Sequence, residues 1–472
     1  MKYSRRVYRI LGLALPVVTL VAGCNLAPQE TEAERARLDE VGKNYEPTLE
    51  QRQLPELAQR PTWQDLLHYA FLANGDLETA YFDWKAAVTR VSIAGSYPNT
   101  NITLSYSYLF SGGKMKAWDR STLGVGFDPA MSLQWPEKVR AAARAALHDA
   151  QAKGERFAVA KFDLQQKVLT TWLEYAGLAE RVRIQTESVE LLKMLMDSAQ
   201  QRVRTGGPQQ DLLKAQTEYE LARNELANMN STMQATRAML NGRLGRAGTE
   251  ALLPPEALPT PRTLAVDDAA LIAVAVDNNP ELGGLAHDVA GRSDALELAR
   301  MAYIPDISPQ LTISGNISQM LGSMMTLPTN LPKIRGSIEE AEAMVRGAEA
   351  ALRQTRRERG ATFVATLYAL RNNERQITLL REVIYPKAKQ VLTSSYQAYS
   401  GGTIGFAELI DSQRTLLEVR RVLVEAQIAR EQRLAELETL AGVDVETLAV
   451  PTTAPTTAPA TMPATLPATT LP

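Results

Sequence analysis

Few residues of this chain have the types and the spacing that catalysis or metal binding requires. The three histidines, His68, His148 and His287, are far apart in the sequence and follow no metal-ligand spacing. Paired carboxylates such as Glu339-Glu340 stand where a helix N-terminus favours negative charge. The sequence contains no nucleophile elbow and no phosphate-binding loop. It therefore predicts no enzyme, no cofactor and no metal site.

The single cysteine stands where its thiol is a candidate for lipid modification. Residues 1–23 combine a basic start, a short apolar stretch and small residues, as in a cleaved export signal. The end of this segment, Val21-Ala22-Gly23-Cys24, resembles a bacterial lipobox, although the usual first residue is Leu. This resemblance implies a diacylglycerol on Cys24 and hence a stable membrane anchor. The alternative is an ordinary signal peptide with a chance cysteine.

Composition favours long helices and excludes some classes of partner. Aromatic residues make up 6% of the chain, and the formal net charge is −2. Such a chain offers no basic field for nucleic acid. After the signal the sequence has no apolar run long enough for a transmembrane helix, so we expect strands to make any membrane crossing.

The sequence contains two copies of one pattern of predicted helices, strands and turns. The first copy covers residues 63–245 and the second covers residues 267–442. Each predicts a helix, a Pro break, two alternating strands, a very long helix, a double-glycine turn and a return helix. The matching residues are Asn74-Gly75-Asp76-Leu77 with Asn279-Pro280-Glu281-Leu282, and Gln216 and Leu244-Gly245 with Gln413 and Ala441-Gly442.

Three further segments flank the copies. Residues 24–62 are polar and interrupted by prolines, which predicts an extended N-terminal arm. Residues 246–266 form a Pro-rich linker between the copies. Residues 443–472 become a Pro, Thr and Ala tail that lacks the pattern to fold and is predicted to be disordered.

The strands alternate between apolar and polar residues. In copy one, Leu104, Tyr106 and Phe110 alternate with small polar residues, and in copy two Leu311 and Ile313 do the same. This period of two is typical of a strand between lipid and water, and equally of a half-buried sheet in a soluble protein. The return strands, around Leu123 to Phe127 and Met325 to Leu327, are weaker.

Closure of the sheet predicts an oligomer. Four strands in lipid would leave unpaired backbone groups at both edges, each costing several kcal/mol. A membrane barrel needs about eight strands or more. We expect three chains to close a twelve-stranded barrel around an aqueous lumen, rather than two chains around a lumen filled with side chains.

Two stretches predict helices of roughly 65–70 residues, or about 100 Å. They run from Pro136 to Thr205 and from Pro332 to Ser400. Their apolar residues step by threes and fours, as in a coiled coil. On the last return helix, Arg430 and Arg433 break the pattern. They are predicted to face solvent, a neighbouring chain or the lumen, with solvent the favoured choice.

Taken in this duplicated order, the features resemble the TolC-type outer-membrane factor family, over about residues 63–442, and the lipobox resembles its lipoprotein branch. The resemblance implies a homotrimer with a β-barrel in the outer membrane and an α-barrel in the periplasm. It also implies a periplasmic adaptor and an inner-membrane transporter of the RND or ABC class as partners. The chain would then be a lipid-anchored protein of the cell outer membrane that extends into the periplasm.

The double-glycine turns are the candidate adaptor contacts implied by this resemblance. Gly206 and Gly207 lie in the first turn, and Gly401, Gly402 and Thr403 lie in the second. Gly402-Thr403 matches the family's Gly-Thr pattern, whereas Gly207 is followed by a proline. As plain structure, glycine at these positions permits a left-handed helix cap.

A gate at the same end is also implied by the resemblance. Tyr399 and Asp411 occupy positions where family members narrow the tube, while the family's basic gate residue is replaced by Ile404. Three Asp411 carboxylates around a three-fold axis would favour cations. The alternative is that Asp411 is an ordinary exposed helix residue.

Two functions remain open from the sequence. The first is a passive, gated exit duct of a tripartite efflux pump or type I secretion system. The second is a structural lipoprotein whose coiled coils brace the envelope without conducting. Alternation between a lipid and a water face favours the duct, because a brace has no use for it.

Overall fold

The computed structural model describes residues 26–97, 102–110, 113, 115–127, 134–262, 264, 267–269, 271–272, 278–314 and 318–444. Cys24 and the export signal lie outside these residues, as does all but the start of the predicted tail. The elements are α2 (Glu30–Tyr45), the 3₁₀ turn η1 (Leu49–Gln51), α3 (Trp63–Ala73), α4 (Gly75–Ala94), β1 (Ile102–Tyr108), β2 (Ser121–Phe127), α5 (Pro136–Arg204), α6 (Gln209–Arg243), α8 (Pro280–Arg300), the 3₁₀ turn η2 (Met301–Tyr303), β3 (Asp306–Ser314), β4 (Ser318–Thr326), α9 (Leu331–Leu379), the π-helix η3 (Leu380–Ile384), α10 (Tyr385–Ser400) and α11 (Phe406–Ala441). The chain is therefore mainly helical with few strands, as predicted.

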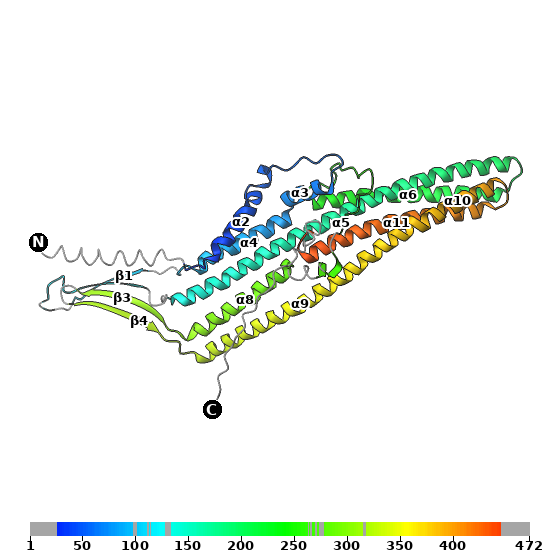
Figure 1. The fold of residues 1–472 in the computed structure, drawn as a ribbon. Helices are drawn as coiled ribbons and strands as arrows, with labels where there is room; N and C mark the ends of the chain where they lie inside the picture. The colour runs from blue at the N-terminus through cyan, green and yellow to red at the C-terminus, as the bar shows by residue number, and fades with distance from the viewer. Residues whose placement is uncertain are drawn as a thin grey trace, which may run out of the picture.

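A four-stranded sheet forms one end of the elongated molecule (Figure 1). The strand order is β1-β2-β3-β4, and every neighbouring pair is antiparallel. The two strands of each copy pair with each other, and β2 pairs with β3 across the copies. This order leaves β1 and β4 as the edges of the sheet.

The strand register sorts residues onto two faces of the sheet, because directly paired residues point the same way. Leu104 pairs with Val125, Tyr106 pairs with Leu123, and Leu123 also pairs with Ile313. On the other face, Thr122 pairs with Ser314, and their hydroxyl oxygens lie 3.0 Å apart. The side chains of Leu104 and Tyr106 are 69% and 65% exposed in the single chain. The predicted alternation is therefore present in β1, β2 and β3, and Leu104 and Tyr106 of its apolar face are uncovered.

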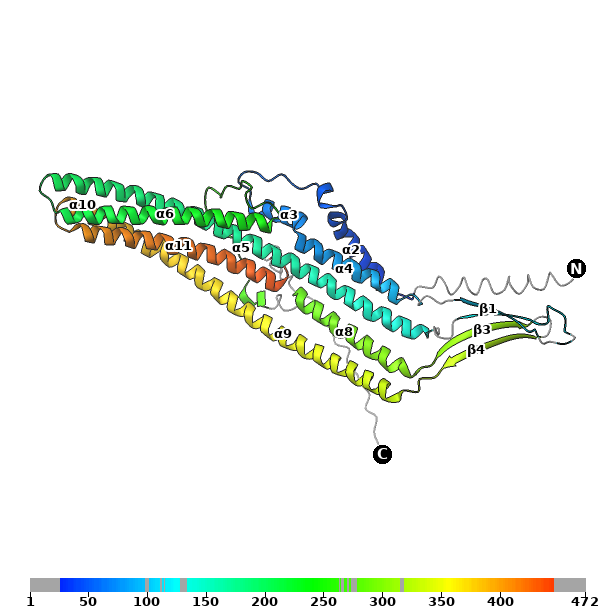
Figure 2. The ribbon, with the colours of Figure 1, turned by 180° about the vertical axis from the view of Figure 1, so that it is seen from behind.

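Helices in two successive layers continue from the sheet. Near the sheet the contacts give the order α4-α5-α8-α9. Farther away the order is α6-α5-α11-α9, with α10 extending the line of α9. The long helices α5 and α9 belong to both layers, and Figure 2 shows the same arrangement from behind. Each layer has two edge helices, as the sheet has two edge strands.

The first long helix matches its predicted range closely. It begins at Pro136, where the missing N–H costs no helical hydrogen bond, and ends at Arg204. Along it, Val168, Trp172 and Leu192 are buried, as a coiled-coil seam requires. The helix therefore spans the whole body, from the base of the sheet to the far tip.

The second long helix differs from the prediction of one regular helix. Between α9 and α10 the chain forms one π-helical turn, Leu380–Ile384, which ends two residues before Pro386. A proline inside a helix removes one hydrogen-bond donor and crowds the preceding turn. The wider π turn accommodates that disturbance without ending the helix. Pro386 was the sequence signal for this irregular turn.

The N-terminal arm also differs from the predicted extended segment, because residues Glu30–Tyr45 form the helix α2. Its buried residues include Leu38 and Tyr45, which join the core against α4 and α5. Glu34 is 3% exposed and accepts a hydrogen bond of 2.8 Å from Nε1 of Trp84. The segment is rich in Glu, Ala and Arg, which favour a helix, and its contacts with the rest of the fold hold that helix in place.

Candidate functional site

The two hairpin turns at the tip share one capping geometry. Gly206 and Gly402 have φ angles of 95° and 77°, in the left-handed region that favours glycine. In the first turn Gly207 N donates to Arg202 O at 2.9 Å, and in the second Thr403 N donates to Ala398 O at 3.0 Å. These are Schellman-type caps. Gly206 is thus the counterpart of Gly402, and Gly207 the counterpart of Thr403.

An arginine of the first hairpin binds the end of the second. The guanidinium of Arg202 lies 4.2 Å from the centroid of the Tyr399 ring. Its Nη2 donates to the carbonyl oxygens of Tyr399, at 2.7 Å, and Ser400, at 3.3 Å. Cations are favoured at the C-terminal end of a helix, because its last carbonyls lack partners. We call this contact the Arg202 clasp.

Tyr399 lies inside the tip core rather than on its surface. It is 4% exposed and packs edge-on against Phe406, with ring centroids 5.7 Å apart. Among the described contacts its buried hydroxyl has no hydrogen-bond partner. Burial raises the pKa of Tyr399, although the nearby Arg202 acts in the opposite direction. In this conformation the side chain lines no open passage, so its role at a gate stays a prediction.

Asp411 has the opposite environment, on the exposed side of α11. The next two residues point inward: Ser412 Oγ lies 2.8 Å from Ser395 Oγ, and Gln413 Nε2 donates to Ser188 Oγ at 2.6 Å. Of the two candidate gate residues, Tyr399 is therefore buried and Asp411 is exposed, and no described hydrogen bond joins their side chains.

Two asparagines each join the start of one helix to the end of a helix farther along the chain. Asn74 Oδ1 accepts from the backbone N–H groups of Asp76 and Leu77 at the start of α4, and its Nδ2 donates to Arg243 O at the end of α6. Asn279 likewise accepts from Leu282 N and donates to a carbonyl at the end of α11. The matched sequence motifs thus meet in space, which sequence comparison of the copies had not indicated.

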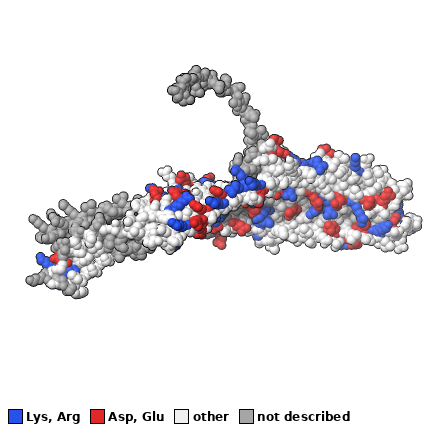
Figure 3. All heavy atoms as spheres, turned by 90° about the horizontal axis from the view of Figure 1, so that it is seen from below, with Lys and Arg blue, Asp and Glu red and all other residues white. Residues whose placement is uncertain are grey.

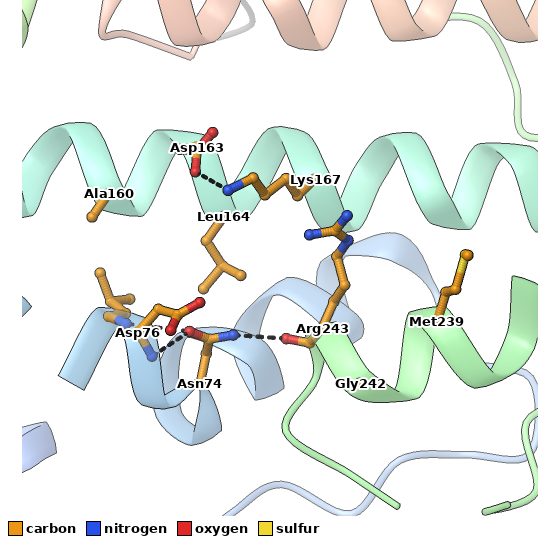
Figure 4. A pocket seen from close by; sticks show the side chains of 10 residues that line it. Asn74, Asp76, Ala160, Asp163, Leu164, Lys167, Met239, Gly242 and Arg243 are labelled. Carbon is orange, nitrogen blue, oxygen red and sulfur yellow. Dashed lines mark hydrogen bonds and ion pairs between the residues drawn. The ribbon is translucent and has the colours of Figure 1, made fainter. Parts of the chain in front are cut away.

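A cavity of about 400 Å³ lies beside the contact that Asn74 makes between α4 and α6 (Figure 4). Its polar lining includes Asp163 and Lys167, which form an ion pair with each other, and Asn74, whose amide is committed to that contact. The remaining charged groups are Asp76 and Arg243, of opposite sign. Of these groups, Asn74 serves the packing of helix ends, and Asp163 and Lys167 serve each other.

The prediction for Arg430 is wrong, because this side chain is buried. It is 7% exposed and pairs with Glu374 at 3.0 Å and with the neighbouring Glu431. Glu431 also pairs with Arg262 of the linker, at 3.2 Å. Arg433 is exposed and pairs with Glu436 at 2.6 Å. The break in the apolar pattern thus marks an ion network that ties the linker to α9 and α11.

The three histidines are far apart in the sequence, but the fold brings two of them together. His148 on α5 and His287 on α8 stack with ring centroids 5.8 Å apart, while His68 lies elsewhere on the exposed side of α3. Their separation in sequence gave no signal of this contact. Over the described ranges, no group of three or more His, Cys, Asp or Glu side chains could hold a metal ion. Likewise, none of the described helices is long and apolar enough to span a bilayer.

Comparison with known families decides what this arrangement is related to. Residues 66–246 match the family described as outer membrane efflux protein. The predicted resemblance to this family is thereby confirmed. A curated relative, the cobalt-zinc-cadmium resistance protein CzcC of Cupriavidus metallidurans, is 22% identical over 267 residues. The match spans 55% of this chain and 62% of CzcC.

Solved structures share the fold of this chain. A membrane protein from Pseudomonas aeruginosa superimposes with a TM-score of 0.69 and 21% identity, covering 81% of this chain and 90% of that one. The outer membrane protein VceC of Vibrio cholerae superimposes with a TM-score of 0.69 and 17% identity, covering 81% of this chain and 96% of VceC. The MtrE outer membrane channel of Neisseria gonorrhoeae superimposes with a TM-score of 0.67 and 18% identity, covering 81% of this chain and 89% of MtrE. At these identities the likeness establishes the fold.

Proposed function

We propose that this chain is the outer-membrane channel of a tripartite efflux pump or type I secretion system, a passive and gated duct formed by three copies. One observation carries the proposal. The sheet ends in the edge strands β1 and β4, the second helical layer ends in α6 and α9, and the sheet presents exposed apolar side chains such as Leu104 and Tyr106. A contact between different edges repeats from copy to copy and generates a ring when the rotation closes.

The sheet has the charge pattern of a membrane segment. Its strands carry no Lys, Arg or Glu and a single Asp, Asp306, at the first position of β3. Figure 3 shows uncharged surface along the sheet, with charged groups at its far end and over the helices. Trp118 and Trp135 are exposed at opposite ends of the sheet, where aromatic side chains favour the membrane interface.

The helical edges also support assembly with identical copies. On α6, the exposed side chains include Leu213 and Leu221, and along α9 and α10 they include Tyr368, Val391 and Tyr396. One edge of the second layer is α6, and the opposite edge is α9 continued by α10. Chains arranged in a ring would therefore pack the exposed side chains of α6 against those of α9 and α10 of the next chain. Burial of each large apolar side chain contributes about 1.5–3 kcal/mol.

The described start of the arm is compatible with a lipid on Cys24. Leu26 N donates to Gly95 O at 2.8 Å, beside the end of α4 that faces the sheet. Two residues cannot span more than about 7 Å. A diacylglycerol on Cys24 would therefore lie near the base of the sheet, where the proposed outer-membrane segment begins.

The tip is the proposed site for partners. Gly206, Gly207, Gly401, Gly402 and Thr403 form the turns at the end farthest from the sheet. We infer that a periplasmic adaptor reaches these turns and connects the duct to an inner-membrane RND or ABC transporter, which supplies the energy. The name of CzcC makes cobalt, zinc and cadmium ions the first cargo to test.

The gate is proposed to be held by the Arg202 clasp. It joins the end of α5 to the end of α10, so the two hairpins of one copy cannot separate at the tip while it is formed. The exposed Asp411 would then act as a carboxylate ring only in the assembled trimer. Removing this ring should reduce the preference of the channel for cations.

The conductance of purified protein in planar bilayers tests the proposed function. We expect discrete, cation-preferring channels, and a weaker cation preference in Asp411→Asn. Asp197→Asn, an exposed carboxylate on α5, is the matched control. A membrane that stays sealed at every voltage would instead support a coiled-coil brace of the envelope.

A further inference from the structure

Within one chain, the stacked histidines lie where a helix of the first sequence repeat packs on a helix of the second. The rings of His148 on α5 and His287 on α8 are 29° from parallel. Close by on α8, a Cβ added at Gly291 would lie 3.2 Å from the Cβ of His148. The backbones of α5 and α8 are therefore close at this point.

His148 has a polar partner on each ring nitrogen. Its Nδ1 lies 3.0 Å from Oε1 of Gln151, and its Nε2 lies 3.5 Å from Oδ2 of Asp294. An imidazolium donates from both nitrogens, so this environment provides an acceptor for each N–H. Asp294 also accepts from Arg144 Nε at 3.1 Å, which already satisfies part of its charge.

His287 faces a different set of charges. Burial, together with the neighbouring His148, holds the pKa of His287 below its ordinary value of 6.5, while Glu155 and Glu34 act in the opposite direction. Both carboxylates are shared with Arg37, at 3.1 Å from Glu34 and 3.6 Å from Glu155.

The remaining charge beside His287 is also paired. Asp288, the next residue on α8, pairs with Arg156 of α5 at 3.1 Å. The acidic groups around the stack thus already have arginine partners. A second proton on the stack would therefore meet a like charge with incomplete compensation.

We propose that the His148–His287 stack is an acid-sensitive joint, which weakens the packing of α8 on α5 when both rings are protonated. The sign follows from linkage. The unfolded chain binds a proton at His287 more readily than the folded chain does. The contribution of this joint to stability is therefore fully present above the ordinary pKa of 6.5 and is lost as the pH falls below it.

Thermal unfolding of the full chain in detergent, near pH 7.5 and near pH 5.5, tests the joint. We expect the acid-induced fall in Tm to be about 2 °C smaller in His287→Gln and His148→Gln than in the unaltered chain. His68→Gln is the matched control, because this exposed third histidine lies outside the stack. An equal fall in Tm in all four proteins would overturn the proposal.

Hydrogen exchange of the unaltered chain gives a second measurement that requires no variant. Acidification should increase exchange, corrected for intrinsic rates, in α8 and in the part of α5 that faces it. Exchange at the tip turns serves as the internal reference. If the α5 and α8 amides keep the same protection at both pH values, the proposed joint does not exist.

Discussion

Single residues at helix ends hold the long elements of this molecule in register. Asn74 and Asn279 each bind the start of one helix and the end of another. Beside them, Gly245 and Gly442 adopt φ angles of 73° and 67°. Side-chain amides thus satisfy helix-end groups that would otherwise lack partners, and left-handed glycines let the backbones approach.

Gly442→Ala should be strongly destabilising. A Cβ at this position would clash with the side chain of Pro280 and lie 2.7 Å from Asn278 O, in a backbone conformation that costs about 1–2 kcal/mol for a non-glycine residue. We expect a loss of about 2 kcal/mol or more and a clearly lower Tm, measured by thermal unfolding.

Gly242→Ala is the matched control for this prediction. Gly242 lies within α6, beside the contact of Asn74 with the end of that helix, and an added Cβ there meets no atom within 4 Å. The exchange should be neutral or stabilising by up to about 1 kcal/mol. Equal effects of the two substitutions would show that the close backbone contact at Gly442 is unimportant.

At the scale of elements, the sequence predicts what local pattern controls. Period-two alternation located the strands, and prolines and glycines located the ends of α5 and the tip turns. The helix α2 was missed although its residues are strong helix formers, because the prolines around it were interpreted as an extended arm. The burial of Arg430 was missed because it depends on contacts with distant segments. The stack of His148 on His287 was missed for the same reason.

Arg202→Gln should loosen the tip, where the Arg202 clasp joins the ends of α5 and α10. The change removes a cation–π contact and two charge-assisted hydrogen bonds, together about 2 kcal/mol, or roughly a thirty-fold change in the population ratio of clasped and unclasped tips. We expect faster hydrogen exchange at residues 399–403 and more frequent channel opening in bilayers.

Arg204→Gln provides the comparison, because Arg204 is exposed two residues farther along the same helix. No hydrogen bond or ion pair joins its side chain to any described residue. This substitution also removes one positive charge near the tip. If both variants show the same exchange and the same opening frequency, the clasp does not hold the gate.

At the scale of the whole molecule, one chain forms part of a wall. The strand order leaves β1 and β4 as edges of the sheet, and the helix order of the second layer leaves α6 and α9 as its edges. The sheet exposes apolar side chains such as Leu104 and Tyr106, which favour lipid over water. The proposal of a duct depends on these edges being shared among copies.

The mass of the particle formed by the purified mature chain in detergent or nanodiscs tests shared closure most directly. Native mass spectrometry, combined with images viewed along the long axis, would count the copies and show whether the ring is closed. We predict three copies around a central passage. A stable particle of one chain, with its apolar sheet face in water and no detergent bound, would contradict the account.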